Sequence, residues 1–311
     1  MTPEVKKILE GDQRTGARLI SLIEDRDPAG IAMLKALYPH AGKAFLIGVT
    51  GPAGAGKSTL VARMIGRLRE RGLRVGVVAV DPTSPISGGA LLGDRIRMRG
   101  HETDPGVFIR SMAARGQTGG IGLATREAAL VMDAMGYQVV AIETVGAGQG
   151  EVAVTRCVHT TAVVSIPGMG DEVQAMKAGL LEIGDVFVVN KADRPGADDL
   201  VQILESMVAM RSYPPGEWRP PVVKTIAVQN EGIDRLIDLL FEHRCHLEST
   251  GRLAERLSRN EFHFFRHLVL DMAAKVLLQD SSELTTLRAD LSRHTIDPYS
   301  AAEKLLGRLN R

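Results

Sequence analysis

The sequence predicts an α/β fold in which a mostly parallel, doubly wound sheet is covered by helices on both faces. Three observations indicate this fold. Short runs rich in Val and Ile alternate with longer helical runs between residues 45 and 248. The short runs are almost continuously apolar, as strands buried on both faces are. A glycine-rich loop follows the first run and precedes a helical one, which is the setting of a phosphate-binding loop.

The elements follow in order along the chain. Strands are expected at 45–50, 74–80, 106–112, 138–144, 161–167, 185–190 and 221–227. Helices are expected between them at 57–71, 119–136, 172–183, 196–211 and 231–248. Only helical patterns occur on either side of this core. We therefore expect a helical extension over 1–40, a core over 41–248 and a helical arm over 249–311.

The composition of the 311-residue chain excludes several classes of protein. Its 38 Lys and Arg residues against 37 Asp and Glu residues exclude binding of nucleic acid or anionic lipid by bulk charge. Cys157 and Cys245 are too few for a disulfide scaffold, which fits a reducing compartment. No apolar run approaches the roughly 20 residues that cross a bilayer. We expect a cytoplasmic protein with neither nucleic acid nor a membrane as a partner.

A phosphate-binding loop is expected between the first strand and the first core helix, where the sequence fits G-x-x-x-x-G-K-[ST]. Glycines allow backbone N–H groups to surround phosphate oxygens, and the helix N-terminus favours negative charge. Lys57 is expected to reach the β- and γ-phosphates, and Ser58 to bind Mg²⁺. A glycine-rich turn without a ligand is the weaker alternative. The residues predicted to bind the phosphates are Gly51, Gly54, Ala55, Gly56, Lys57, Ser58 and Thr59.

The base of the nucleotide is predicted from Asn190, Lys191 and Asp193, which directly follow or end a core strand. The carboxylate of Asp193 can accept hydrogen bonds from both N1–H and the exocyclic amine of guanine, whereas adenine lacks this donor pair. Asn190 and Lys191 would brace the loop. The pattern favours GTP and GDP as ligands, with ATP as the alternative.

Three carboxylates are expected at the edge of the sheet where such folds bind ligands. Asp81 and Glu143 end strands, and Asp94 lies in the loop after Asp81, where a solvated charge is an alternative. Mg²⁺ prefers oxygen ligands, so these residues and Ser58 form the predicted metal site. Gln149, in a glycine-rich loop, is a candidate to position the attacking water, although a plain surface role fits it equally. The residues assigned to catalysis are Lys57, Asp81, Glu143 and Gln149.

Longer motifs extend these patterns: GPAGAGKST at 51–59, VDPTSPISGGALLGDRIRM at 80–98, ETVGAGQGE at 143–151 and NKAD at 190–193. On these motifs the chain resembles the MeaB and methylmalonic aciduria type A (ArgK-like) family of P-loop GTPases. The resemblance implies a GTP-hydrolysing chaperone that gates adenosylcobalamin delivery to an acyl-CoA mutase, methylmalonyl-CoA mutase or a close relative, and helps to protect or reactivate it. It also implies a homodimer built through the C-terminal helices.

Further residue roles follow from the same resemblance. The backbone of Ala227 is implied to lie beside the base, and the segment 168–179 to signal to the mutase through Asp171, Glu172 and Lys177. Two alternatives stay open. One is a guanine-nucleotide-dependent adaptor with little hydrolysis. The other is a nickel-type metallochaperone GTPase, which would carry Cys or His ligands near the loops, where the only Cys is Cys157.

Overall fold

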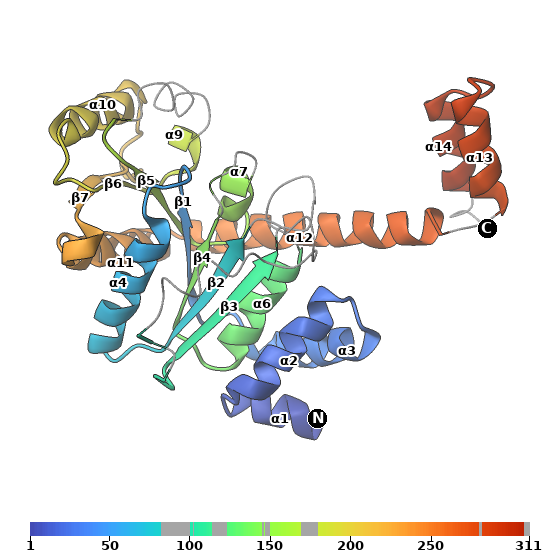
Figure 1. Ribbon diagram of the computed structural model, residues 1–311, viewed down its shortest axis with the longest axis horizontal. Coiled ribbons are helices and arrows are strands. Elements are labelled where there is room, and N and C mark those ends of the chain that lie inside the picture. Colours follow the sequence, from blue (N-terminus) through green and yellow to red (C-terminus); the bar gives the residue numbers. More distant parts are fainter. Residues whose placement is uncertain are drawn as a thin grey trace. The chain divides into compact units, whose positions relative to one another are not determined.

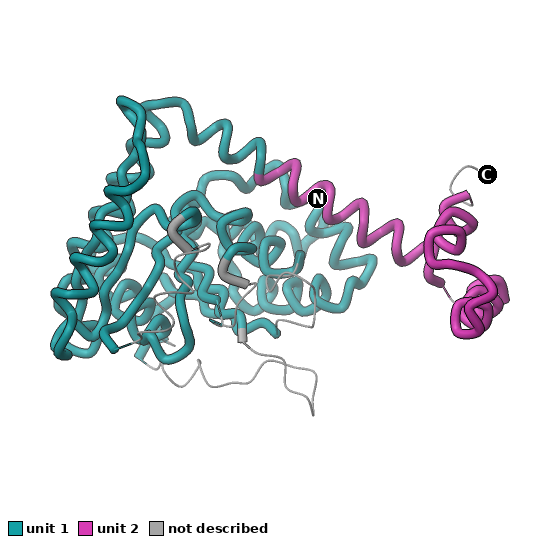
Figure 2. Tube along the Cα trace, turned by 90° about the horizontal axis from the view of Figure 1, so that it is seen from above, with its two compact units in different colours: residues 1–259 teal, residues 260–311 magenta. Residues whose placement is uncertain are grey.

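The computed structural model describes residues 1–81, 100–101, 103–113, 123–144, 146, 150–168, 180–279 and 282–307. The chain divides into two compact units, Met1–Arg259 and Asn260–Arg311 (Figure 2). In the first unit a seven-stranded sheet lies between helices on its two faces (Figure 1). All neighbouring strands are parallel. The predicted fold class is therefore confirmed.

The strands follow the order β3-β2-β4-β1-β5-β6-β7. Their bounds are β1 Phe45–Thr50, β2 Val75–Asp81, β3 Val107–Ala113, β4 Val139–Glu143, β5 Thr160–Ser165, β6 Val186–Asn190 and β7 Val222–Thr225. Because β1 lies between β4 and β5, the chain changes its direction of winding beside β1. Ligands bind at such a switch point, outside the carboxyl ends of the strands.

Apolar clusters on both faces of the sheet explain why its strands are buried, and β2 contributes to two of them. Along β2, Val75 and Val77 pack on one face, where the core includes residues of α4 (Lys57–Glu70) and α11 (Ile233–Ser249). Val78 and Val80 pack on the other face against residues of α6 (Leu123–Ala134) and α7 (Gly150–Thr155). Alternate side chains thus face opposite cores, as the geometry of a strand requires. The other core helices are α9 Leu180–Ile183 and α10 Ala197–Met210, with short 3₁₀ turns at Tyr38–His40 (η1) and Ala227–Gln229 (η2).

Three N-terminal helices, α1 (Pro3–Leu9), α2 (Gln13–Glu24) and α3 (Pro28–Leu37), share the second of these cores. Several polar contacts accompany the apolar ones. Arg26 donates to both carboxylate oxygens of Glu127 at 2.8 Å. The Gln13 amide donates to Tyr137 Oη at 2.8 Å. These helices therefore belong to the same compact unit as the sheet.

The second unit is helical. α12 (Arg252–Leu277) begins in the first unit and continues into the second, where α13 (Ser282–Ser292) and α14 (Pro298–Leu306) follow. Asp297 caps α14 by accepting from the N–H groups of Tyr299 and Ser300 at 2.9 and 3.0 Å. Across the described parts of both units, no helix has the length and apolar character needed to span a membrane.

Candidate nucleotide-binding site

The loop between β1 and α4 lies at the carboxyl edge of the sheet and approaches its neighbours closely. Gly51 has φ +138°, and a Cβ there would lie 2.1 Å from the carbonyl oxygen of Val164. Gly56 has φ +85°, and a Cβ there would lie 2.5 Å from Asn190 Nδ2. Only glycine fits both the backbone conformation and the space at these two positions. The loop leads directly into the N-terminus of the 14-residue α4, which favours an anionic ligand.

Lys57 and Ser58 are the first two residues of α4, and both are buried. The Lys57 ammonium donates to the carbonyl oxygens of Gly51 and Pro52 at 2.8 and 2.9 Å. The Ser58 hydroxyl donates to Glu143 Oε1 at 2.6 Å, and Glu143, which ends β4, is only 2% exposed. The structure thus brings two residues of the phosphate-loop motif together with a carboxylate that was predicted separately from the end of a strand.

The pair formed by Ser58 and Glu143 fits a divalent cation of the magnesium type. Both side chains offer hard oxygen donors, and they lie within hydrogen-bonding distance at the start of a helix that follows the phosphate loop. Burial of the carboxylate leaves it little exchange with bulk water. Thr59, the next residue of α4, is partly exposed.

Asp81 ends β2 on the same side of the sheet. Ala79 pairs with Glu143 across β2 and β4, so the backbone of Asp81 lies two residues beyond the level of Glu143. The structure does not describe the side chain of Asp81. The remaining predicted site residues also lie outside the described residues: Asp94, Gln149, Asp171, Glu172 and Lys177.

Asn190, the last residue of β6, links the predicted base-reading loop to the phosphate loop. Its amide Nδ2 donates to the carbonyl oxygen of Ala55 at 2.8 Å. Its Oδ1 accepts from the Thr225 hydroxyl at 3.1 Å and from the Ala227 N–H at 3.2 Å. The N–H that the resemblance places beside the base therefore holds the Asn190 amide in this structure. Thr225 was given no role of its own, although it begins the segment Thr225-Ile226-Ala227 that the resemblance places beside the base.

Lys191 reaches the phosphate loop as well. It adopts φ +55°, and its ammonium donates to the carbonyl oxygen of Gly54 at 2.8 Å. Asp193 is exposed, which leaves its carboxylate accessible to a ligand. Asn190 and Lys191 thus join the loop predicted to bind the base to the loop predicted to bind the phosphates.

A glycine that the sequence analysis did not assign completes the site. Gly146 has φ +81°, and a Cβ there would lie 2.4 Å from the carbonyl oxygen of Gly51 and 2.7 Å from Lys57 Nζ. Its backbone therefore lies directly against the phosphate loop. Just before it, the hydroxyls of Thr144 and Thr50 are 2.9 Å apart and buried. Gly146 lies three residues after Glu143 in the sequence, and this short separation was the available signal.

The described residues include no group of three or more His, Cys, Asp or Glu side chains suited to a metal ion. Burial raises the pKa of the Cys157 thiol to about 11. A thiol with such a pKa is protonated at neutral pH, and the thiolate is the metal-binding form. Cys157 itself is therefore a poor candidate for a soft-metal ligand.

Comparison with protein families gives one match over most of the chain. The family described as methylmalonyl Co-A mutase-associated GTPase MeaB matches residues 16–282. A Pyrococcus abyssi protein assigned to the GTPases is 47% identical over 306 residues, which cover 97% of this chain and 94% of that protein. The GTPase ArgK of Escherichia coli K12 is 35% identical over 262 residues, or 82% and 79% of the two chains.

Two further similarities agree with this match. The mouse mitochondrial methylmalonic aciduria type A homolog is 36% identical over 216 residues, which cover 68% of this chain and 52% of the mouse protein. Among solved structures, an LAO/AO transport system kinase superposes with a TM-score of 0.73 at 27% identity, covering 99% of this chain and 97% of that one.

Proposed function

The chain belongs to the MeaB family of methylmalonyl Co-A mutase-associated GTPases, and we propose that it is a Mg²⁺-dependent GTPase that gates adenosylcobalamin delivery to an acyl-CoA mutase. The client in this proposal is methylmalonyl-CoA mutase or a close relative, which the GTPase also protects or reactivates. The observation that carries the proposal is the convergence of Lys57, Ser58 and Glu143 at the phosphate loop.

The proposed chemistry is phosphoryl transfer from GTP to water. Rotation of the Lys57 side chain would exchange two loop carbonyls for oxygens of the β- and γ-phosphates, where its charge stabilises the transition state. Ser58 and Glu143 would hold Mg²⁺, which when bound supplies neutralisation of the phosphate charge, and Asp81 is a further proposed ligand. We also propose that Glu143 helps to orient the attacking water, and the same role is proposed for Gln149.

Guanine recognition is proposed for Asp193, with Asn190 and Lys191 fixing its loop. The bonds from these two residues to Ala55 and Gly54 support this role, because they fix the position of the proposed base-reading loop relative to the phosphate loop. A nucleotide bound across both loops would then contact the phosphate loop with its phosphates and the base-reading loop with its base, and the two loops are hydrogen-bonded to each other.

A homodimer formed through the C-terminal helices is part of the proposal. α12 carries large apolar side chains that are exposed in the single chain: Leu257, Phe262, Phe265, Val269, Leu270, Met272 and Val276. Contiguous apolar surface of this kind on a helix marks an interaction site. A second copy is the proposed occupant, and sedimentation equilibrium would test it.

The deciding experiment measures phosphate release from GTP by the purified full-length protein, alone and with adenosylcobalamin-dependent mutases from the same genome. ATP serves as the control substrate and Lys57→Ala as the control protein. Slow turnover that rises with one mutase and is absent in Lys57→Ala is expected. Turnover that no mutase changes would contradict the mutase part of the proposal. Tight GTP binding without turnover under any condition would favour the adaptor.

A further inference from the structure

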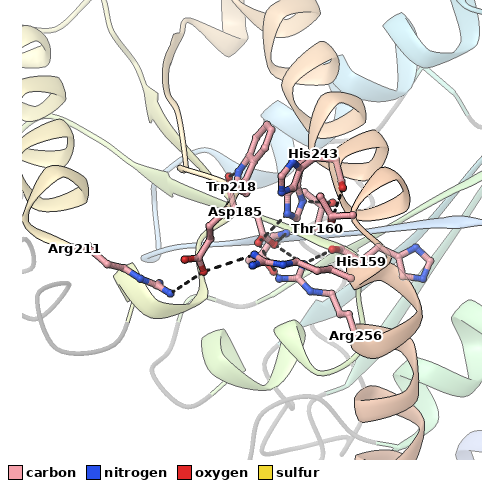
Figure 3. A network of polar contacts seen from close by, with 12 residues as sticks. His159, Thr160, Asp185, Arg211, Trp218, His243 and Arg256 are labelled. Carbon is pink, nitrogen blue, oxygen red and sulfur yellow. Dashed lines mark hydrogen bonds and ion pairs between the residues drawn. The ribbon is translucent and has the colours of Figure 1, made fainter. Parts of the chain in front are cut away.

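Asp185 lies immediately before β6, at the edge of the sheet opposite the nucleotide site, and bonds to several distant segments (Figure 3). Its Oδ2 accepts from the Thr161 N–H of β5 at 2.8 Å. Its backbone carbonyl accepts from the Trp218 indole N–H at 2.8 Å. The Arg256 guanidinium of α12 donates to both carboxylate oxygens, each at 2.9 Å. One buried residue thus joins β5, the segment before β7 and the start of α12.

His243 of α11 is a further member of this cluster, and its imidazole is uncharged. Its Nε2 lies 3.3 Å from Asp185 Oδ1, and its Nδ1 lies 2.9 Å from the Thr160 hydroxyl. Since a carboxylate only accepts, Nε2 carries the proton and Nδ1 accepts from Thr160. Burial lowers the pKa of His243 to about 4, despite Asp185, and Arg256 lowers it further. The imidazole is therefore neutral at pH 7, and Arg256 is the cation that balances Asp185.

β6 connects this cluster to the nucleotide site. The strand has five residues, all buried, and pairs with β5 on one side and β7 on the other. Asp185 precedes its first residue, and Asn190, which bonds to Ala55 of the phosphate loop, is its last. A strand of this length spans about 17 Å. Because a close-packed interior transmits strain, a shift of the Asn190 end would reach Asp185.

We propose that Asp185 and Arg256 relay the nucleotide state of the phosphate loop to the start of α12. The relay rests on the proposed function, because it requires a guanine nucleotide at that loop. Its output is the orientation of Arg256, in the second turn of a helix that continues into the C-terminal unit. Arg256 is a positioning residue here: it contacts no nucleotide and acts through Asp185.

Trp218 makes the relay measurable, because it is the single tryptophan of the chain. Its indole bonds to Asp185, and its ring centroid lies 5.0 Å from that of His243 and 5.5 Å from that of His246. Intrinsic tryptophan emission therefore reports on this cluster alone. The experiment records emission of the full-length protein with GDP and with a non-hydrolysable GTP analogue. Calorimetry on the same samples measures the binding of each nucleotide.

The wild-type emission is expected to differ between the two nucleotides. In Arg256→Gln both nucleotides bind with unchanged affinity, but the difference in emission is lost. Arg256→Lys keeps the charge without the two-point contact and recovers only part of the difference. Arg259→Gln, which removes an exposed arginine three residues later on α12, keeps all of it. Should Arg256→Gln fail to fold, the emission of Arg256→Lys serves as the test of the relay.

Three results would overturn the relay. Identical wild-type emission with both nucleotides bound refutes it and leaves the proposed GTPase intact. A full difference in emission retained by Arg256→Gln, or by Arg256→Lys where that variant decides, refutes the role of the ion pair. Absence of nucleotide binding by calorimetry refutes the proposed function and the relay together.

Discussion

The two edges of the sheet are built in different ways. At the carboxyl edge, side chains of Lys57, Asn190 and Lys191 bond mainly to backbone carbonyls of the phosphate loop. At the amino edge, the Asp185 carboxylate bonds to a backbone N–H and to two other side chains, one of them the guanidinium of Arg256. At the first edge, side chains bond to neutral backbone groups of a loop. At the second edge, a buried carboxylate is neutralised by a guanidinium of the same protein.

This difference predicts that substitutions at one edge mainly change nucleotide binding, whereas substitutions at the other mainly change stability. The loop carbonyls are neutral, so a carbonyl that loses the side chain bonded to it carries no uncompensated charge, and substitutions at the carboxyl edge should affect nucleotide binding more than the fold. Loss of one partner from a buried ion pair leaves the other charge buried without a counter-ion. Substitutions at the amino edge should therefore lower stability first. Each prediction below tests this separation.

Lys57→Ala should have the largest effect. Removal of the ammonium is expected to lower kcat/KM for GTP by about 10²–10³-fold, because a preorganised charge at the phosphates is lost. The free energy of unfolding should fall by about 1–2 kcal/mol, since hydrogen bonds to two neutral loop carbonyls disappear. Phosphate release and urea denaturation measure the two quantities. Lys224→Ala, an exposed lysine of β7, is the matched control. Unchanged GTP hydrolysis in Lys57→Ala would refute the site.

Asp193→Asn should change the choice of base. The amide replaces two acceptors with one acceptor and one donor, so guanine loses a charged hydrogen-bond pair of about 1.5–3 kcal/mol while xanthine gains a partner. Competition between guanosine and xanthosine diphosphates measures the shift. Asp199→Asn, another exposed carboxylate nearby in the sequence, should show none. The same preference for guanine in both variants would count against the base assignment.

Much of the carboxyl edge was predictable because the residues of each motif lie next to one another in the sequence. Residues 51–58 and 190–193 form motifs with fixed spacing along the chain, and their binding roles stay a prediction. The seven strands were predicted from their apolar runs within a few residues of their bounds. The contact between Ser58 and Glu143 needed only the rule that parallel strands end at one edge.

The amino edge was not predictable from such patterns. Asp185 bonds to Thr161 and Arg256, which are 24 and 71 residues away in the sequence, and no fixed spacing relates them. The position of Gly146 against the phosphate loop was missed for a similar reason, because the close approach depends on the tertiary path of the chain. The helices before residue 40 gave no sequence signal that they share a core with the sheet.

Asp185→Ala should lower the free energy of unfolding by about 3 kcal/mol, because Arg256 is left as a largely buried charge without its carboxylate. Nucleotide affinity should stay near the wild-type value. Urea denaturation and calorimetry measure the two effects. Asp198→Ala removes a surface partner of Lys224 and should cost less than about 1 kcal/mol. A larger loss in nucleotide affinity than in stability would break the separation between the two edges.

The smallest effect should be a pH dependence that belongs to the amino edge. Burial lowers the pKa of His159 and of His243 to about 4, and arginines nearby lower both further. His159 Nδ1 accepts the Leu46 N–H at 3.1 Å, and this bond requires the unprotonated nitrogen. Unfolding restores a pKa near 6.5, so between pH 6.5 and pH 4 the unfolded chain binds more protons than the folded one. Stability is complete above this window and falls as the pH decreases through it.

Between pH 7 and pH 5 each histidine should therefore contribute a loss of about 1–2 kcal/mol in the free energy of unfolding. His243→Gln should flatten the dependence, since glutamine does not titrate. His40→Gln, which removes an exposed histidine, should leave it unchanged. Urea denaturation at both pH values measures the difference. If all three proteins lost the same stability, the titration would arise outside the Asp185 cluster, and the amino edge would be sensitive to substitution without being sensitive to protons.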